Sequence, residues 1–184
     1  MIYDPDKHHR RSNRLANYDY SKTGLYFVTL CTRGRECLFG DIINGEMILN
    51  DFGRIVQEEW CRSGTIRQEI ELGEYIIMPN HLHGIIIISH PANAGAFGER
   101  PQQGCRSCKT VLKPKTLGSL MSGFQSSVTR RINQIRKTPG ISVWQRNYHD
   151  RIIRDERDLN RIRDYIQNNP LNWHQDKENP LNKT

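Results

Sequence analysis

The chain has 184 residues, of which 36% are hydrophobic and 26% charged, a composition typical of a soluble globular protein. No apolar run reaches the roughly 18 residues needed to cross a bilayer, which excludes a membrane-spanning helix. The first residues, MIYDPDKHHRRSNR, contain no hydrophobic segment of a signal peptide. We therefore expect a single cytoplasmic domain in which the five cysteines are reduced.

The charge is unevenly distributed along the chain, which has a formal net charge of +7. Residues 101–163 carry fourteen bases against four acids, whereas residues 36–74 carry nine acids against three bases. A short basic cluster also opens the chain. This asymmetry favours a surface that binds a polyanion, and nucleic acid is the commonest polyanion. The alternative is a basic surface that is merely solvated.

The N-terminal part predicts an arm, a strand and a hairpin. Residues 1–24 form a basic, irregular arm. Residues 25–32 (LYFVTLCT) are rich in aromatic and β-branched types and favour a strand. Residues 37–50 hold two short apolar runs around Asn44-Gly45, a hairpin signal because both residues tolerate positive φ.

A helix and two strands are expected next. Asn50 or Asp51 can cap a helix that runs to about residue 63. Strands follow at 69–78 and 81–89. The second of these does not alternate between apolar and polar residues, which is typical of a central strand covered on both faces.

The remaining elements are a loop, two helices and an extended segment. The Gly- and Pro-rich residues 90–114 predict a loop insertion. Residues 116–137 have helical apolar periodicity with a basic opposite edge. Residues 142–153 look extended, and a helix is expected from Asp155 to about residue 168. The polar residues 171–184 predict a flexible C-terminal tail.

This order of elements indicates an α+β fold. Strands separated by two crossing helices suit a single antiparallel sheet with helices packed on one face, as in ferredoxin-like domains. The core domain is expected over residues 25–170, between the arm and the tail.

His81 and His83 are the most informative pair of residues in the chain. They stand one residue apart at the start of an apolar strand, so their side chains project from the same face. Two neighbouring imidazoles are a ready pair of metal ligands, and their protonation is expected to weaken metal binding below about pH 6. The alternative is a partly wet strand end in which the histidines only form hydrogen bonds.

A second group of candidate residues lies on the last predicted helix. Tyr165 and Asn169 are four residues apart and therefore share a face. In isolation, such a tyrosine usually packs its ring and leaves its hydroxyl in water.

Three segments together resemble one family. They are PNHLHG after an apolar strand, VWQRNYHDRIIRDE, and DYIQNNP. In this order they are similar to the REP-associated tyrosine transposases, relatives of insertion-sequence transposases that move single-stranded DNA. These proteins are HUH enzymes, named for two histidines around a hydrophobic residue, here Leu82. The resemblance covers about Tyr20 to Trp173.

The resemblance implies a ferredoxin-like core and a mechanism. Tyr165 would be the nucleophile of a single-strand DNA endonuclease and strand transferase, forming a 5′-phosphotyrosine. His81, His83 and Asn169 would bind a divalent cation, Mg²⁺ or Mn²⁺. The substrate would be single-stranded DNA beside a hairpin of a palindromic repeat. A homodimer is an open alternative to a monomer, because insertion-sequence relatives pair their subunits.

Basic residues supply the candidate DNA contacts. The N-terminal ones would hold the foot of the hairpin, a role that the resemblance suggests: Lys7, Arg10, Arg11 and Arg14. The others would contact phosphates: Lys113, Lys115, Arg130, Arg131, Arg154 and Arg161. Each could instead be a solvated surface charge.

Three other interpretations compete with the HUH assignment. A structural zinc site could combine Cys105 and Cys108 with the two histidines. A non-catalytic single-stranded nucleic-acid-binding module of RNA-recognition type would use aromatic residues of the strand LYFVTL. A relaxase or replication initiator would share the chemistry, although the short length counts against it.

Overall fold

The centre of the molecule is one four-stranded antiparallel sheet. The computed structural model describes residues 18–89 and 115–182. The sheet has the order β4-β5-β1-β6. Its strands are β1 (Gly24–Cys31), β4 (Ile70–Met78), β5 (His81–Ile88) and β6 (His149–Ile153). Since helices connect β1 to β4 and β5 to β6, the topology confirms the predicted ferredoxin-like α+β fold.

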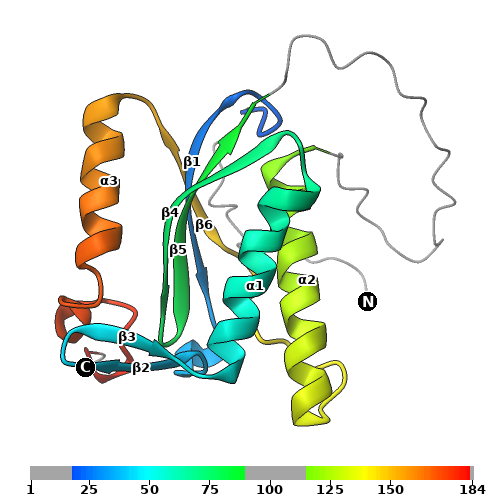
Figure 1. Cartoon of the computed structure of the whole chain (residues 1–184), viewed down its shortest axis with the longest axis vertical. Helices are drawn as coiled ribbons and strands as arrows, with labels where there is room; N and C mark the ends of the chain where they lie inside the picture. Colours follow the sequence, from blue (N-terminus) through cyan, green and yellow to red (C-terminus); the bar gives the residue numbers. More distant parts are fainter. Residues whose placement is uncertain (1–17, 90–114, 183–184) are drawn as a thin grey trace, which may run out of the picture.

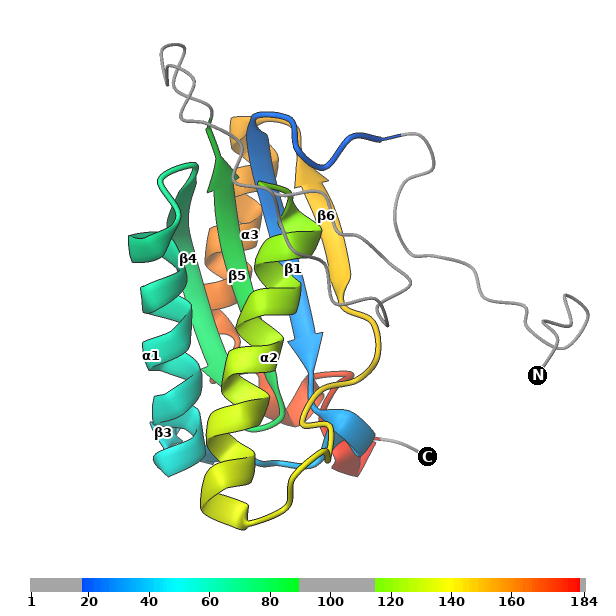
Figure 2. The same ribbon diagram turned by 90° about the vertical axis from the view of Figure 1, so that its right-hand side faces the viewer.

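Helices cover both faces of this sheet. Helices α1 (Asp51–Ile66) and α2 (Leu117–Arg136) lie side by side on one face, and α3 (Glu156–Asn168) lies on the other (Figures 1 and 2). The expectation that all helices would share one face was therefore wrong. The reason is that the sheet is apolar on both faces, and each apolar face needs cover.

The larger core lies between the sheet and the pair α1 and α2. Tyr26, Val28 and Leu30 of β1 are fully buried there. Trp60 of α1 packs edge-to-face on Phe124 of α2, with ring centroids 5.3 Å apart. The central strand β5 is buried along almost its whole length, as its lack of alternation predicts.

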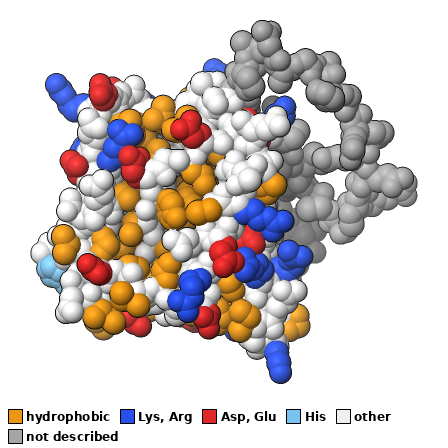
Figure 3. All heavy atoms as spheres, in the orientation of Figure 1, with side chains coloured by type: hydrophobic (Ala, Val, Ile, Leu, Met, Phe, Trp, Pro, Cys, Tyr) orange, Lys and Arg blue, Asp and Glu red, His pale blue; other side chains and the backbone are white. Residues whose placement is uncertain are grey.

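The smaller core lies beneath α3. Ile162 and Ile166 of α3 pack on Ile85 and Ile153 of the sheet. One helix cannot cover a whole sheet face, and hydrophobic side chains gather in the middle of the view in Figure 3. The groove between α3 and β4 is lined by partly exposed residues such as Leu25 and Ile76.

Local turn and cap signals act as the sequence predicts. Strands β2 (Gly40–Ile43) and β3 (Glu46–Leu49) form a separate hairpin. Its turn residues Asn44 and Gly45 have φ of 53° and 79°. Asn50 caps α1 by accepting hydrogen bonds from two backbone amides, and Asp155 caps α3 from the side chain.

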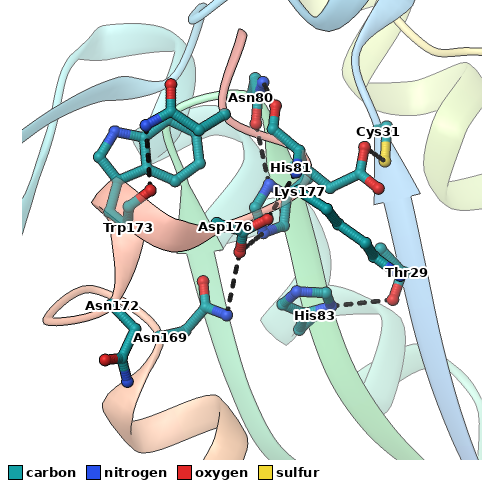
Figure 4. Close-up of polar contacts among 12 residues, drawn as sticks. Thr29, Cys31, Asn80, His81, His83, Asn169, Asn172, Trp173, Asp176 and Lys177 are labelled. Carbon is teal, nitrogen blue, oxygen red and sulfur yellow. Dashed lines mark hydrogen bonds and ion pairs between the residues drawn. The ribbon is translucent and has the colours of Figure 1, made fainter. Parts of the chain in front are cut away.

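Two segments differ from the expectation. Only His149–Ile153 of the extended residues 142–153 form a strand, and Trp144 makes a single bridge to Thr32. Residues 171–182, expected to be a flexible tail, are folded against the end of the sheet that carries His81 (Figure 4). This segment contains the short 3₁₀ helices η2 (Trp173–Gln175) and η3 (Pro180–Asn182).

The C-terminal segment folds because its polar side chains bond to its own backbone. Asp176 Oδ1 accepts from the Glu178 amide at 2.6 Å. The Asn179 side chain donates to the Trp173 carbonyl at 3.0 Å and accepts from the Leu181 amide at 3.0 Å. Such local bonds let a polar sequence pack without an apolar stripe. None of the described helices is long and apolar enough to cross a membrane.

Gly84 of β5 leaves room for the Trp60 indole, because a Cβ at this position would overlap that ring. We expect Gly84→Ala to lower the free energy of unfolding by about 1–3 kcal/mol in urea denaturation, as overpacking does. The control is Gly123→Ala in α2, where a Cβ would meet nothing closer than Arg67 Nη2 at 3.9 Å. That change should stabilise the protein by roughly 0.4–1 kcal/mol. Equal effects of the two substitutions would contradict this packing.

Candidate active site

The paired histidines lie at the end of β5, on the face that α3 covers. In the register of β5 with β1, His81 is opposite Cys31 and His83 is opposite Thr29. The side chains of both histidines are buried, and the centroids of their rings are 4.5 Å apart. The two imidazoles are therefore neighbours, as the spacing predicts.

The amide of Asn80 determines which nitrogen of His81 carries a hydrogen. Asn80 is fully buried, and its Nδ2 donates to the Arg35 carbonyl at 3.0 Å and the Glu178 carbonyl at 2.7 Å. These two acceptors fix the amide, so Oδ1 faces His81 Nδ1 at 2.8 Å (Figure 4). Because Oδ1 can only accept, Nδ1 carries the hydrogen and Nε2 keeps a free lone pair.

His83 is held between two hydroxyl groups. Its Nδ1 lies 2.8 Å from Thr29 Oγ1, and its Nε2 lies 3.1 Å from the Tyr165 hydroxyl. Phe27 stacks on the imidazole, with ring centroids 5.3 Å apart. The Tyr165 ring stands edge-to-face to Phe27, so the phenol is directed toward the histidine pair.

The tyrosine of the last helix thus reaches the histidines within one chain. Tyr165 belongs to the third turn of α3, and 42% of its surface is exposed. Asn169 caps the C-terminal end of the same helix and is buried. The sequence argument from a shared helix face is consistent with this geometry.

Two buried polar atoms at the centre of the site have no hydrogen-bond partner among the described residues. They are His81 Nε2 and Asn169 Oδ1. Asn169 Nδ2 donates to Asp176 Oδ2 at 3.3 Å, and the same carboxylate lies 3.9 Å from His81 Nε2. Buried polar atoms without partners are costly, so these atoms indicate a site built for a ligand.

Asp176 is the site residue that the sequence did not reveal. One ligand atom each from His81, His83 and Asp176 lie within 4.8 Å of one another, and all three residues are buried. The aspartate comes from the segment after η2, in a run of mixed polar residues (NWHQDKEN) without periodicity. No spacing rule connects it to the histidines, since only the folding of residues 171–182 brings it there.

Burial keeps both imidazoles neutral. Desolvation lowers the pKa of His81 to about 4, against the opposing effect of the Asp176 carboxylate. Burial, and then His81, hold the pKa of His83 well below its usual value. The sequence-based expectation of protonation below about pH 6 therefore moves to a lower pH. Neutral imidazoles are the form that binds metal.

Burial also raises the pKa of a phenol and of a thiol at the site. Desolvation, and then the Asp176 carboxylate, raise the pKa of Tyr165 to about 12. Burial, and then Glu178, raise the pKa of the Cys31 thiol to about 12. Burial therefore favours the thiol over the thiolate at Cys31 and the phenol over the phenolate at Tyr165.

A cavity of 640 Å³ opens in front of Tyr165. Its wall includes three cationic side chains, Arg151, Arg161 and Lys177. Arg151 and Arg161 share the Asp158 carboxylate at 2.9 Å and 2.6 Å. The same wall carries the carboxylates of Asp150, Asp176 and Glu178, so cations and acids lie together around Tyr165 and His83. The arginines of this wall are the side chains that suit a phosphodiester.

The predicted DNA contacts are scattered over the molecule. Arg161 lies in this cavity, and Lys115 and Arg154 are exposed elsewhere. Arg130 lies on α2, on the opposite face of the sheet. Arg131 pairs with Glu58 and Glu59 of α1 at 2.6 Å and 2.9 Å, so it is not a free phosphate contact. The remaining candidates lie outside the described residues: Lys7, Arg10, Arg11, Arg14 and Lys113.

The competing interpretations fare differently. Cys105 and Cys108 of the suggested zinc site lie outside the described residues. An RNA-recognition module needs aromatic rings on the open sheet face, but Tyr26 is fully buried under α1 and α2. Among the described residues of this strand, only the ring of Phe27 borders the cavity.

The chain is similar to known proteins in sequence and in fold. No family model matches the chain. A protein of Haemophilus influenzae, named only as uncharacterized, is 41% identical over 183 residues, which are 95% of this chain and 96% of that protein. A second protein of that organism is 25% identical over 164 residues, 85% of this chain and 77% of the other. It carries the provisional name of a REP-associated tyrosine transposase.

A solved structure has the same fold. It is a REP-associated tyrosine transposase bound to a REP hairpin, with 17% identity and a TM-score of 0.56. The match covers 89% of this chain and 76% of that chain. The chain is thus similar in sequence to a protein provisionally named a REP-associated tyrosine transposase, and it shares the fold of a solved protein of that name. It belongs to one family with the 41% identical Haemophilus influenzae protein.

The depressed pKa of His81 predicts a pH-dependent stability. Between pH 6.5, its ordinary value, and about 4, the folded state binds fewer protons than the unfolded state, so stability falls as the pH falls. This ring alone should contribute a slope of at most about 1.4 kcal/mol per pH unit. We expect His81→Gln to flatten the slope of unfolding free energy in urea titrations over this window. The control His174→Gln, at an exposed position, should keep the original slope. An unchanged slope for His81→Gln would contradict the shift.

Proposed function

We propose that the protein cleaves and rejoins single-stranded DNA through a 5′-phosphotyrosine on Tyr165, as a single-strand endonuclease and strand transferase of HUH type. The observation that carries the proposal is the 3.1 Å contact between the Tyr165 hydroxyl and His83 Nε2, beside His81. A tyrosine directed at paired buried imidazoles, in a cavity whose wall includes two arginines and a lysine, has the parts that phosphodiester exchange needs.

The reaction proposed for Tyr165 conserves the phosphodiester bond. The phenol oxygen attacks the phosphorus, a bond forms between them, and the bond from phosphorus to the 3′ oxygen breaks. The phenol loses one proton and the departing 3′ oxygen gains one, so a free 3′-OH remains. Attack by a 3′-OH on the phosphotyrosine reverses the step, so strands can be rejoined without another energy source.

A divalent cation fits the donor atoms of the site. His81 Nε2 and Asn169 Oδ1 are buried without partners, and His83 Nε2 and the Asp176 carboxylate lie beside them. The mixture of imidazole, amide and carboxylate donors suits Mg²⁺ or Mn²⁺. When bound, such a cation would neutralise phosphate charge and favour the ionised phenol. We propose these four residues as its ligands, with Asp176 added to the set expected from sequence.

The proposed substrate is a palindromic repeat hairpin with its single-stranded flank. A relative of this fold was solved bound to a REP hairpin, and the cavity before Tyr165 is lined by Arg151, Arg161 and Lys177. Cations at these positions would hold phosphates. We propose the cytoplasm as the compartment in which the protein meets this DNA. The predicted homodimer remains an alternative to a monomer.

Tyr165→Phe tests the nucleophile. We expect a labelled single-stranded repeat oligonucleotide with Mn²⁺ to give a covalent adduct with the native protein and none with Tyr165→Phe, read on a denaturing gel. The ring and its packing are kept, so only the attacking oxygen is lost. Tyr75→Phe, on the opposite face near Cys61, is the matched control and should retain the adduct. An adduct that persists in Tyr165→Phe would end the assignment.

Asp176→Asn tests the added ligand without any assay of activity. Removal of the carboxylate charge should lower the affinity for Mn²⁺ by at least about tenfold in calorimetric titration, since even the outer partners of metal ligands have effects of this size. The matched control is Asp164→Asn on the exposed side of α3. Equal Mn²⁺ affinity in the two variants would remove Asp176 from the ligand set.

A further inference from the structure

A second large groove lies on the face of the sheet that α1 and α2 cover. It has a volume of 820 Å³ and runs between the C-terminal half of α2 and the chain that returns toward β6. Residues 125–137 form one wall, and residues 139–146 form the other. The groove shares no lining residue with the cavity before Tyr165.

The charges of this groove are all of one sign. Its lining includes Arg130, Lys137 and Arg146, and no carboxylate among the described residues. All three cations are exposed, and none forms an ion pair within the described chain. The neighbouring Arg131 differs from Arg130, because Arg131 forms ion pairs with two glutamates of α1. Arg130 is left to face the groove.

The polar side chains that line the groove beside these cations are amides and hydroxyls, the hydroxyls being those of Ser126, Thr129 and Ser142. Gln125 and Gln134 come from α2, and Gln145 comes from the opposite wall. An amide offers both a donor and an acceptor and can therefore bond to the edge of an unpaired base. A groove that offers both cations and amides fits a single strand, whose phosphates can bind the cations while its unpaired bases form hydrogen bonds to the amides.

The groove and the candidate active site both lie near the C-terminal end of strand β1. The backbone amide of Gln145 donates to the Cys31 carbonyl at 2.9 Å, at the end of β1. Arg146 lines the groove, and His149 and Arg151 line the cavity before Tyr165. Only residues 147 and 148 separate the two lining sets along the chain, just before the edge strand β6.

We propose that this groove binds a single-stranded segment of the DNA strand on which Tyr165 acts, at a distance from the scissile phosphate. The inference rests on the proposed function and adds the path of the flanking strand. The phosphates of the segment lie against Arg130, Lys137 and Arg146, and its unpaired bases face the amides. An acidic protein partner or the paired stem of a hairpin would be a different occupant.

The test measures binding in the absence of catalysis. Full-length Tyr165→Phe protein in chelator is titrated against a fluorescent DNA hairpin with single-stranded flanks of about ten nucleotides, a length typical of such sites. The groove variant adds Arg130→Gln, Lys137→Gln and Arg146→Gln. The control variant adds Lys22→Gln, Arg62→Gln and Arg157→Gln, three exposed cations outside both lining sets with the same change of net charge.

We expect the groove variant to bind this DNA at least about tenfold more weakly near 100 mM salt, and the slope of log affinity against log salt to fall by about 2, since three phosphate contacts are lost. The control should stay within about twofold of the parent. Equal losses in both variants, or no loss in either, would overturn the proposal. An equal loss on a blunt hairpin without flanks would also overturn it, because the stem would then be the occupant. Thermal unfolding of both variants checks that the fold is kept.

Failure of this inference is distinguishable from failure of the proposed function. The binding titration needs neither metal nor Tyr165, whereas the proposed function fails if the native protein forms no covalent adduct with DNA. If the native protein forms the covalent adduct but the groove variant binds DNA as tightly as its parent, only the proposal that the groove holds the single-stranded flank is rejected.

Discussion

The arrangement of the site depends on the amide of Asn80. This amide joins the start of β5 to the Arg35 carbonyl and to the C-terminal segment at Glu178, and it is fully buried. Its oxygen fixes the tautomer of His81, so that Nε2 faces the centre of the site with a free lone pair. The same C-terminal segment supplies Asp176. One hydrogen-bonded junction therefore both closes the fold around the site and prepares its donor atoms.

The two faces of the sheet carry different tasks. The face under α3 holds titratable groups, and it is covered by one helix, so a cavity remains beside Tyr165. The face under α1 and α2 holds the main apolar core and supplies rigidity to β5, where Gly84 lets the Trp60 indole approach the backbone. Histidines on a strand buried this firmly have little freedom to move, which is a requirement for preorganised ligands.

The sequence predicted what local rules determine. The spacing of His81 and His83, the hairpin at Asn44-Gly45 and the cap at Asp155 all follow from periodicity or turn chemistry, and the structure has each of them. Asp176 could not be found in this way, because a carboxylate in a polar run carries no signal until the run folds. The sequence also did not predict that α3 packs on the other face of the sheet, for a related reason. Helical periodicity gives the apolar stripe of a helix but not the sheet face that receives it.

The contact between Tyr165 and His83 has a further consequence. An imidazole nitrogen accommodates one partner at a time, and Nε2 of His83 is engaged by the phenol. Whichever tautomer is present, any ion that takes this nitrogen must displace the hydroxyl. Binding of a cation to His83 Nε2 and release of the Tyr165 hydroxyl from this nitrogen would then occur together. Without a bound cation, the hydroxyl of Tyr165 would stay hydrogen-bonded to His83 and would be a poor nucleophile.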